Sequence, residues 1–114
     1  DWPERGRAYL LLHTTLHELR DYLTVDEAAD LAAQLPVLIR GIFYEGWDPS
    51  RNPVKPRSKE AFLGRIEARF RAEPLLDSQR AVAAVFDLLR RHVSFGEIDD
   101  VASAMRKPLQ GLWR

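Results

Sequence analysis

Hydrophobic residues recur at intervals of three and four along most of this chain, which is the spacing of one face of an α-helix. The first series lies in the N-terminal part of the chain and consists of Tyr9, Leu12, Leu16, Leu19 and Leu23. Later series predict helices at residues 28–35, 37–43, 62–70, 82–93, 101–105 and 108–113. The pattern therefore predicts an all-α protein.

Two short motifs mark where two of these helices begin. Thr24 is followed three residues later by Glu27, and Ser94 is followed in the same way by Glu97. In a capping box the hydroxyl accepts a backbone N–H of the first turn, and the carboxylate accepts the N–H of the cap residue. We assign these four residues a structural role, because capping accounts for each of them without catalysis.

Two segments of the chain have related sequences. A shift of 70 positions aligns residues 16–43 with residues 86–113 without a gap, and the two capping boxes coincide. Six of the 28 aligned pairs are identical: Leu19/Leu89, Arg20/Arg90, Glu27/Glu97, Asp30/Asp100, Ala32/Ala102 and Gly41/Gly111. The repeat predicts an internal duplication, with two related helical units packed into one compact bundle.

The units are expected at residues 7–44 and 58–113, within a single domain that spans residues 1–114. Residues 45–57 form the linker between them, and its prolines at positions 49, 53 and 56 exclude a regular helix there. Ser58 is expected to cap the helix at 62–70, and Pro74 is expected to end it.

Unit two begins with the helix at 62–70, which we expect to pack on the apolar face of residues 82–89. No matching helix precedes unit one, and the sequence starts at Asp1 without a methionine. We therefore expect a helix upstream of Asp1. The face made by Tyr9, Leu12, Leu16 and Leu19 would then be covered by that segment, by a second chain, or by the other unit. It is also the predicted surface for a protein partner or for self-association.

Composition narrows the possible functions. The 114 residues include 17 basic and 17 acidic side chains and no cysteine, which excludes disulfides and thiolate metal sites. No apolar stretch approaches membrane-spanning length and no signal peptide is visible, so we expect no membrane association and a cytoplasmic location.

The sequence contains little evidence for catalysis. No phosphate-binding glycine loop or nucleophile motif is present, so an enzyme is less favoured than a non-catalytic protein, and no cofactor is expected. His13 and His17 have the i, i+4 spacing of zinc ligands on a helix, with a third ligand available only from elsewhere, such as Asp21 or His92.

An excess of basic residues in the middle of the chain suggests an alternative function. Residues 40–71 contain eight basic and four acidic side chains. Arg51, Lys55 and Arg57 lie in the linker near Trp47, and cations beside an aromatic ring can hold phosphate and stack a base. Trp47 is better explained as an anchor that ties the linker to the core.

Several segments resemble a known family. They are residues 23–27, the AAQLP motif at 32–36, residues 41–47 with the following Asp48-Pro49, and residues 96–100. Together they resemble the bacterial family called domain of unknown function 2267, over nearly the whole chain. The resemblance implies a small all-helical bacterial protein, usually cytosolic, with a further helix ahead of this segment. It implies no established activity and no catalytic residues.

The leading hypothesis is therefore a non-catalytic interaction or regulatory module. The alternatives are a protein that binds nucleic acid or phosphate through its basic linker, and a helical protein that binds a small ligand or a metal.

Overall fold

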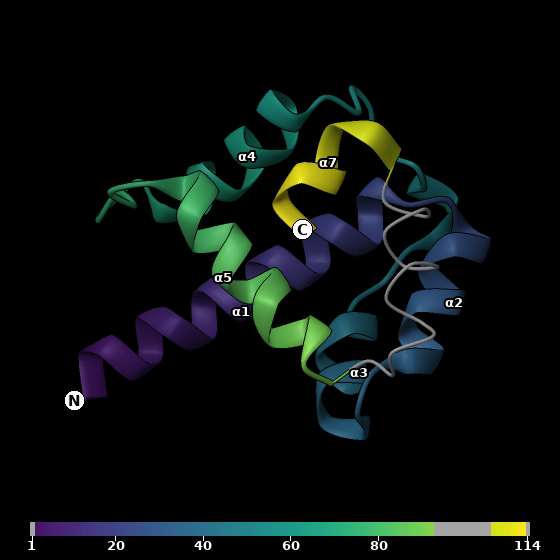
Figure 1. Ribbon diagram of the computed structural model, residues 1–114, viewed down its shortest axis with the longest axis horizontal. Helices are drawn as coiled ribbons and strands as arrows, with labels where there is room; N and C mark the ends of the chain where they lie inside the picture. The colour runs from purple at the N-terminus through teal and green to yellow at the C-terminus, as the bar shows by residue number, and fades with distance from the viewer. Residues whose placement is uncertain (1, 93–105, 114) are drawn as a thin grey trace.

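The structure is a computed structural model that describes residues 2–92 and 106–113 (Figure 1). This part of the chain contains helices and no strand, which confirms the all-α prediction for it. The α-helices are α1 (Trp2–Tyr22), α2 (Val25–Gln34), α3 (Val37–Tyr44), α4 (Lys59–Glu67), α5 (Ser78–Arg90) and α7 (Arg106–Trp113), with 3-10 turns η1 (Pro49–Arg51) and η2 (Ala68–Phe70). None of these helices combines the length and apolar character that crossing a bilayer requires.

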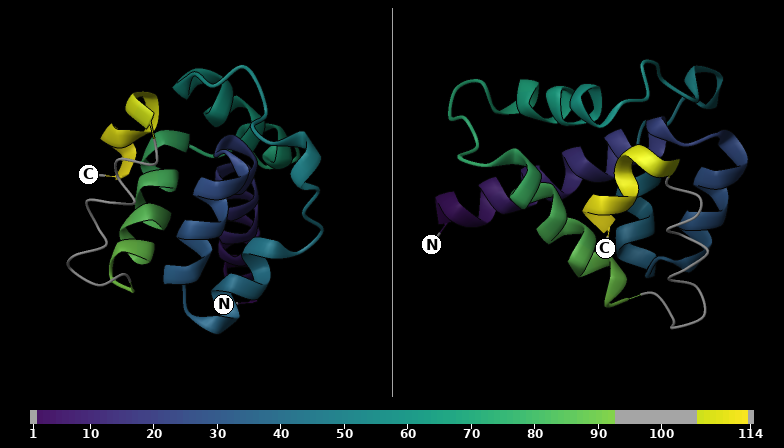
Figure 2. Two further views of the ribbon diagram at one scale, coloured as in Figure 1. Left: turned by 90° about the vertical axis from the view of Figure 1, so that its right-hand side faces the viewer. Right: turned by 45° about the horizontal axis from the view of Figure 1, so that its top comes forward.

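Helix α1 is the axis of the fold. Its 21 residues extend about 32 Å at 1.5 Å per residue, which nearly equals the longest dimension of the molecule, 35 Å. Helices α3, α4 and α5 all pack against it. Figures 1 and 2 show that its N-terminal end projects beyond the bundle. The helix starts earlier than its apolar series suggested, because Pro3 is compatible with a first helical turn.

A line of aromatic rings joins four helices through the core. The ring centroids of Tyr22 and Phe62 are 5.7 Å apart, those of Phe62 and Phe86 are 6.4 Å apart, and those of Phe86 and Trp113 are 5.7 Å apart. These residues come from α1, α4, α5 and α7, and all four are fully buried. The helix predicted to pack on α5 therefore packs on α1 as well.

Helices of this chain cover Leu16 and Leu19, two residues of the predicted partner face. Both side chains are fully buried in the core. They are covered because α4 and α5, which come later in the chain, lie against α1. This was one of the three expected solutions, and only Tyr9 and Leu12 of the predicted face keep exposed surface.

An ion pair reinforces the contact between α1 and α4. Arg65 Nε donates to Glu18 Oε1 at 3.0 Å. Burial raises the pKa of Glu18 although Arg65 opposes this shift. The position of α4 therefore depends on both apolar packing and a partly buried pair.

Arg20 joins the end of α1 to the end of α3. Its Nε and Nη2 donate to the two carboxylate oxygens of Asp21, at 2.8 and 3.2 Å. Its Nη1 donates to the carbonyl oxygens of Phe43 and Glu45, at 3.2 and 2.9 Å. Arg20 is only 6% exposed, so a buried cation satisfies carbonyls that the last turn of α3 leaves unpaired.

The capping box at the start of α2 is present. Thr24 Oγ1 accepts the backbone N–H of Glu27 at 3.2 Å, and Glu27 Oε1 accepts the backbone N–H of Thr24 at 2.9 Å. Ser58 caps α4 through the N–H of Ala61. The second predicted box, Ser94 and Glu97, lies outside the described residues, as does the predicted helix at 101–105.

One predicted helix boundary differs from the structure and another agrees with it. Helix α4 ends at Glu67 and tightens into η2, before reaching Pro74, because a final 3-10 turn pairs carbonyls that an α-helix would leave open. Helix α3 begins at Val37, as its apolar series predicted, and Pro36 is its N-cap.

Replacing Arg20 by methionine should lower the free energy of unfolding by about 3 kcal/mol, because the Asp21 carboxylate and two carbonyls lose their partner. Arg91→Met is the matched control. Arg91 also pairs with an aspartate, Asp87 at 2.7 Å, but its side chain is 73% exposed, so its loss should stay within about 0.5 kcal/mol. Urea denaturation measures both, and equal losses would contradict the role given to Arg20.

Thr24→Ala should cost about 1 kcal/mol, because the N–H of Glu27 loses its acceptor. Thr24→Ser retains the hydroxyl and should cost less. The same denaturation measurement applies, and an alanine variant as stable as wild type would show that the box does not stabilise α2.

Candidate functional site

An open groove lies between the N-terminal half of α1 and helix α5. Its volume is about 320 Å³. The lining is almost entirely apolar and consists of Ala8, Tyr9, Leu11, Leu12, Ala84, Val85 and Leu88. We call it the α1–α5 groove. Tyr9 is 53% exposed and Leu88 is 37% exposed, so two large apolar side chains at this groove remain in contact with water.

The α1–α5 groove contains half of the predicted partner face. Tyr9 and Leu12 line it, whereas Leu16 and Leu19 belong to the core. The residues that α5 contributes were not predicted. A signal for them exists, because Ala84 and Leu88 widen the apolar face of α5 beyond its buried positions.

The structure brings His13 and His17 together. Their ring centroids are 4.1 Å apart, and His13 Nε2 lies 3.6 Å from Glu45 Oε1. His17 Nε2 donates to the carbonyl oxygen of Ile42 at 2.6 Å, which occupies one of its two ring nitrogens. Burial lowers the pKa of His17, so its ring is neutral near pH 7.

In the part of the chain that the structure describes, no third ligand joins this pair. Across the described residues, no three histidine, cysteine, aspartate or glutamate side chains form a group suited to a metal ion. Asp21, named above as a possible third ligand, binds the Arg20 guanidinium. The histidine pair therefore connects α1 to α3 through Ile42.

The linker is held against α1 by Asn52. Its Nδ2 donates to the carbonyl oxygens of Arg20 and Leu23, at 2.6 and 2.8 Å, and its Oδ1 accepts from Trp47 Nε1 at 2.8 Å. Trp47 also contacts the ring of Tyr44, 5.4 Å between centroids. Trp47 thus acts as an anchor for the linker, whereas no feature of the sequence pointed to Asn52.

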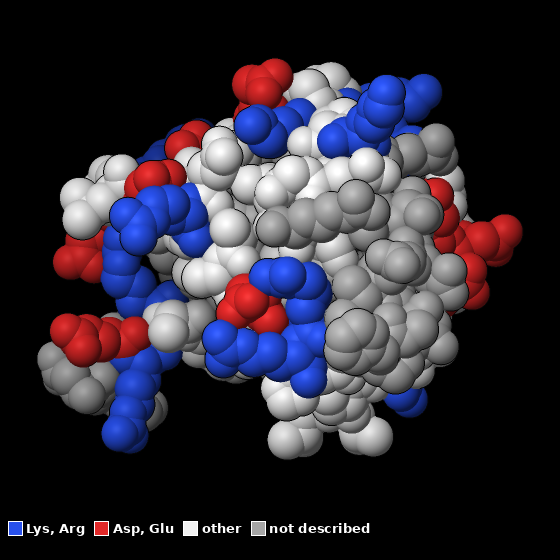
Figure 3. Space-filling model, in the orientation of Figure 1, with Lys and Arg blue, Asp and Glu red and all other residues white. Residues whose placement is uncertain are grey.

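The predicted basic residues differ in their surroundings. Arg57 is partly buried, with its guanidinium 4.9 Å from the centre of the Tyr22 ring and 3.8 Å from Glu27 Oε1. Arg51 and Lys55 are exposed. On the face shown in Figure 3, lysine and arginine side chains form several separate groups, many of them beside acidic ones. The three linker residues therefore do not present equivalent free cations.

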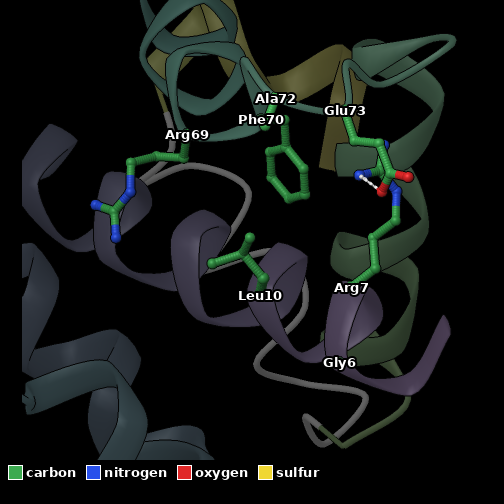
Figure 4. A pocket seen from close by; sticks show the side chains of 7 residues that line it. All are labelled: Gly6, Arg7, Leu10, Arg69, Phe70, Ala72 and Glu73. Carbon is green, nitrogen blue, oxygen red and sulfur yellow. Dashed lines mark hydrogen bonds and ion pairs between the residues drawn. The ribbon is translucent and has the colours of Figure 1, made fainter. Parts of the chain in front are cut away.

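A second hollow lies on the opposite side of α1, where its first turns meet η2 and the residues that follow. Its volume is about 320 Å³ and it is lined by Gly6, Arg7, Leu10, Arg69, Phe70, Ala72 and Glu73 (Figure 4). We call it the arginine pocket. None of its residues was predicted to be functional, because they come from distant parts of the chain.

The fold and its hollows define a class: an all-helical domain in which a long central helix carries an apolar groove on one side and an arginine-lined pocket on the other. The chain belongs to the family described as "Uncharacterized conserved protein (DUF2267)", whose model matches residues 1–112. This confirms the family that the sequence motifs indicated. The search of curated proteins found no match.

The lowered pKa of His17 predicts a loss of stability in mild acid. Below about pH 6.5, the ordinary pKa of histidine, the unfolded chain takes up a proton that the folded protein resists. Stability should therefore fall as the pH drops from that value through the folded pKa, and should be unaffected above it.

Urea denaturation between pH 5 and pH 8 tests this. His17→Gln keeps a donor for the Ile42 carbonyl but cannot titrate, so it should lose less stability over this range than wild type. His92→Gln replaces an exposed histidine and serves as the control. If His17→Gln and His92→Gln show the same acid dependence, His17 is not its source.

Proposed function

We propose that this domain is a non-catalytic interaction module that binds an amphipathic helix of a protein partner in the α1–α5 groove. The observation that carries the proposal is the groove itself, with its apolar lining and the exposed side chains of Tyr9 and Leu88. Full burial of a large apolar side chain is worth about 1.5–3 kcal/mol, so covering these two residues would favour association.

The shape of the groove favours a helix over an extended peptide. Its walls are two helices, and each contributes residues spaced three or four apart, such as Tyr9 and Leu12 on α1 and Val85 and Leu88 on α5. Such rows form ridges separated by grooves into which the side chains of another helix fit. The nearly apolar lining offers few partners for the backbone N–H and C=O groups of an extended peptide, whereas a helix satisfies its own.

Binding of nucleic acid or phosphate through the linker is less well supported. It would depend on Arg51 and Lys55, because Arg57 already contacts Tyr22 and Glu27. Two exposed cations make a small electrostatic contact with a polyanion.

The duplicated architecture is a further part of this proposal. Helix α3 packs on α1, and α7 packs on α5, which is the arrangement two copies of one unit would have. The aligned residues Leu19 and Leu89 are both fully buried, as are Phe43 and Trp113. On this view, the α1–α5 groove lies where the two units meet.

Photo-crosslinking identifies the partner. A benzophenone amino acid at position 9 should form an adduct with one partner protein in the cells that produce this chain. The same group at position 38 is the control, because Leu38 is 84% exposed but lies outside the groove. Adducts that are the same from both positions, or no adduct from position 9, would contradict the proposal.

The helical segment of that partner is then titrated with purified variants. Leu88→Lys and Tyr9→Lys should each weaken binding by about 10-fold or more, because each removes an apolar anchor. Leu38→Lys should bind as wild type does. A second copy of this chain as the adduct, or affinities unchanged by Leu88→Lys, would show that the proposed occupant is wrong.

A further inference from the structure

Helix α3 exposes an apolar face to water. Val37 is 76% exposed, Leu38 is 84% exposed and Tyr44 is 37% exposed. Gly41 is exposed as well, and it lies three or four residues from each of them, so the four positions form one stripe along the helix. We call it the α3 stripe. Uncharged side chains form the lower edge of the molecule in Figure 3, where Figure 1 places α3.

The one charged residue in the sequence of α3 is directed elsewhere. Arg40 Nε donates to the carbonyl oxygen of Ala32 at 2.9 Å, and its Nη2 donates to that of Leu35 at 2.8 Å. Arg40 therefore binds the carbonyl end of α2, where a cation is favourable. The α3 stripe is left without a charge along the length of the helix.

The core does not require apolar residues at these positions. The shift of 70 residues aligns positions 37, 38 and 41 of α3 with Lys107, Pro108 and Gly111 of α7. These three residues of α7 are also exposed, while the opposite face of α7 is buried. Two helices with related sequences thus bury one face each, and only α3 adds large apolar side chains to the exposed face.

The two ends of the α3 stripe have opposite electrostatic character. Within the described residues, no side chain caps the first turn of α3, because its N-cap is Pro36. The N–H groups of that turn carry a partial positive charge. At the other end Glu45 follows the helix, with a side chain that is 63% exposed and lies 3.6 Å from His13 Nε2. Such an exposed contact is weak, so the carboxylate remains accessible to a positive group of another molecule.

The α3 stripe is complementary to itself. Position 41 is midway between 38 and 44 and also midway between 37 and 45. When two copies of α3 lie antiparallel about a two-fold axis at Gly41, Leu38 of each copy packs on Tyr44 of the other. Each Glu45 then lies beside the uncapped start of the opposite helix. A Cβ built on Gly41 meets nothing within 4 Å, so its surface is open and the two backbones can approach closely there.

We propose that the α3 stripe binds a second copy of this chain, as an antiparallel pair of α3 helices related by a two-fold axis at Gly41. The contact between two short helices is small, so the dimer is weak, with a Kd of about 10–100 µM. No residue of the stripe lines the α1–α5 groove. The dimer is therefore independent of the partner binding proposed above, and either can fail without the other.

Sedimentation equilibrium between about 10 µM and about 1 mM measures the dimer directly. Leu38→Asp should raise the Kd by about 10-fold or more, because it places a carboxylate in the apolar contact. Aspartate in the first turn stabilises a helix, so a folding defect would not explain the loss. Leu76→Asp is the matched control, because Leu76 is fully exposed and lies outside α3. A chain that stays monomeric over this range, or equal Kd values for the two variants, would overturn the proposal.

Substitutions of glycine test the geometry. Gly41→Leu adds apolar surface and favours the helix, yet it should raise the Kd by about 10-fold or more because it separates the two backbones. Gly111→Leu, at the aligned open glycine of α7, should leave the Kd unchanged. Glu45→Gln should raise the Kd by about 2- to 5-fold, because it removes the charge at the helix start. A tighter dimer of Gly41→Leu would indicate association through apolar surface alone and would contradict the two-fold arrangement.

Photo-crosslinking identifies the occupant of the stripe in cells. A benzophenone amino acid at position 38 should join two copies of this chain, whereas the same group at position 76 should not. If position 38 forms adducts with another protein or with lipid and none with a second copy, the proposed occupant is wrong.

Discussion

The arrangement of α1 and α3 depends on the interactions of the buried Arg20 guanidinium. A cation in the interior is costly unless its hydrogen bonds are satisfied. Here Asp21 neutralises it, and two carbonyls at the end of α3 accept its remaining donors. Any movement of α3 away from α1 would leave a buried charge without partners. The end of α1, the end of α3 and the start of the linker therefore behave as one rigid corner.

The same corner positions the linker. Asn52 donates to the carbonyl of Arg20 and to that of Leu23, and it also binds Trp47. The backbone N–H of Val54 donates to the carbonyl of Asp21 at 2.8 Å. A proline-rich segment without a long helix is thus ordered by polar contacts to the last turn of α1. Arg57, near the end of the linker, continues this attachment by lying over Tyr22.

The N-terminal end of α1 is less enclosed by neighbouring helices. The 21 residues of this helix exceed the 13 of α5 and the nine of α4, so its neighbours cannot enclose it on all sides. Its N-terminal turns consequently support a hollow on each side, one apolar and one lined by arginines. The C-terminal end of the helix is enclosed by its neighbours, and the less covered end carries both hollows.

Local sequence determined much of the fold. The helical period identified the apolar faces, and Thr24, Glu27 and Ser58 marked helix starts because a cap interacts only with residues of the next turn. Neither hollow could be located in this way. Leu16 and Leu12 are alike in sequence, yet one is in the core and the other lines the groove, because helices far along the chain cover the first completely and the second only in part. Arg7, Arg69 and Arg20 are likewise indistinguishable as isolated arginines. Their roles depend on which carbonyls, carboxylates and rings the tertiary structure places beside each one, since electrostatic and packing energies depend on distances between residues that the linear sequence does not contain.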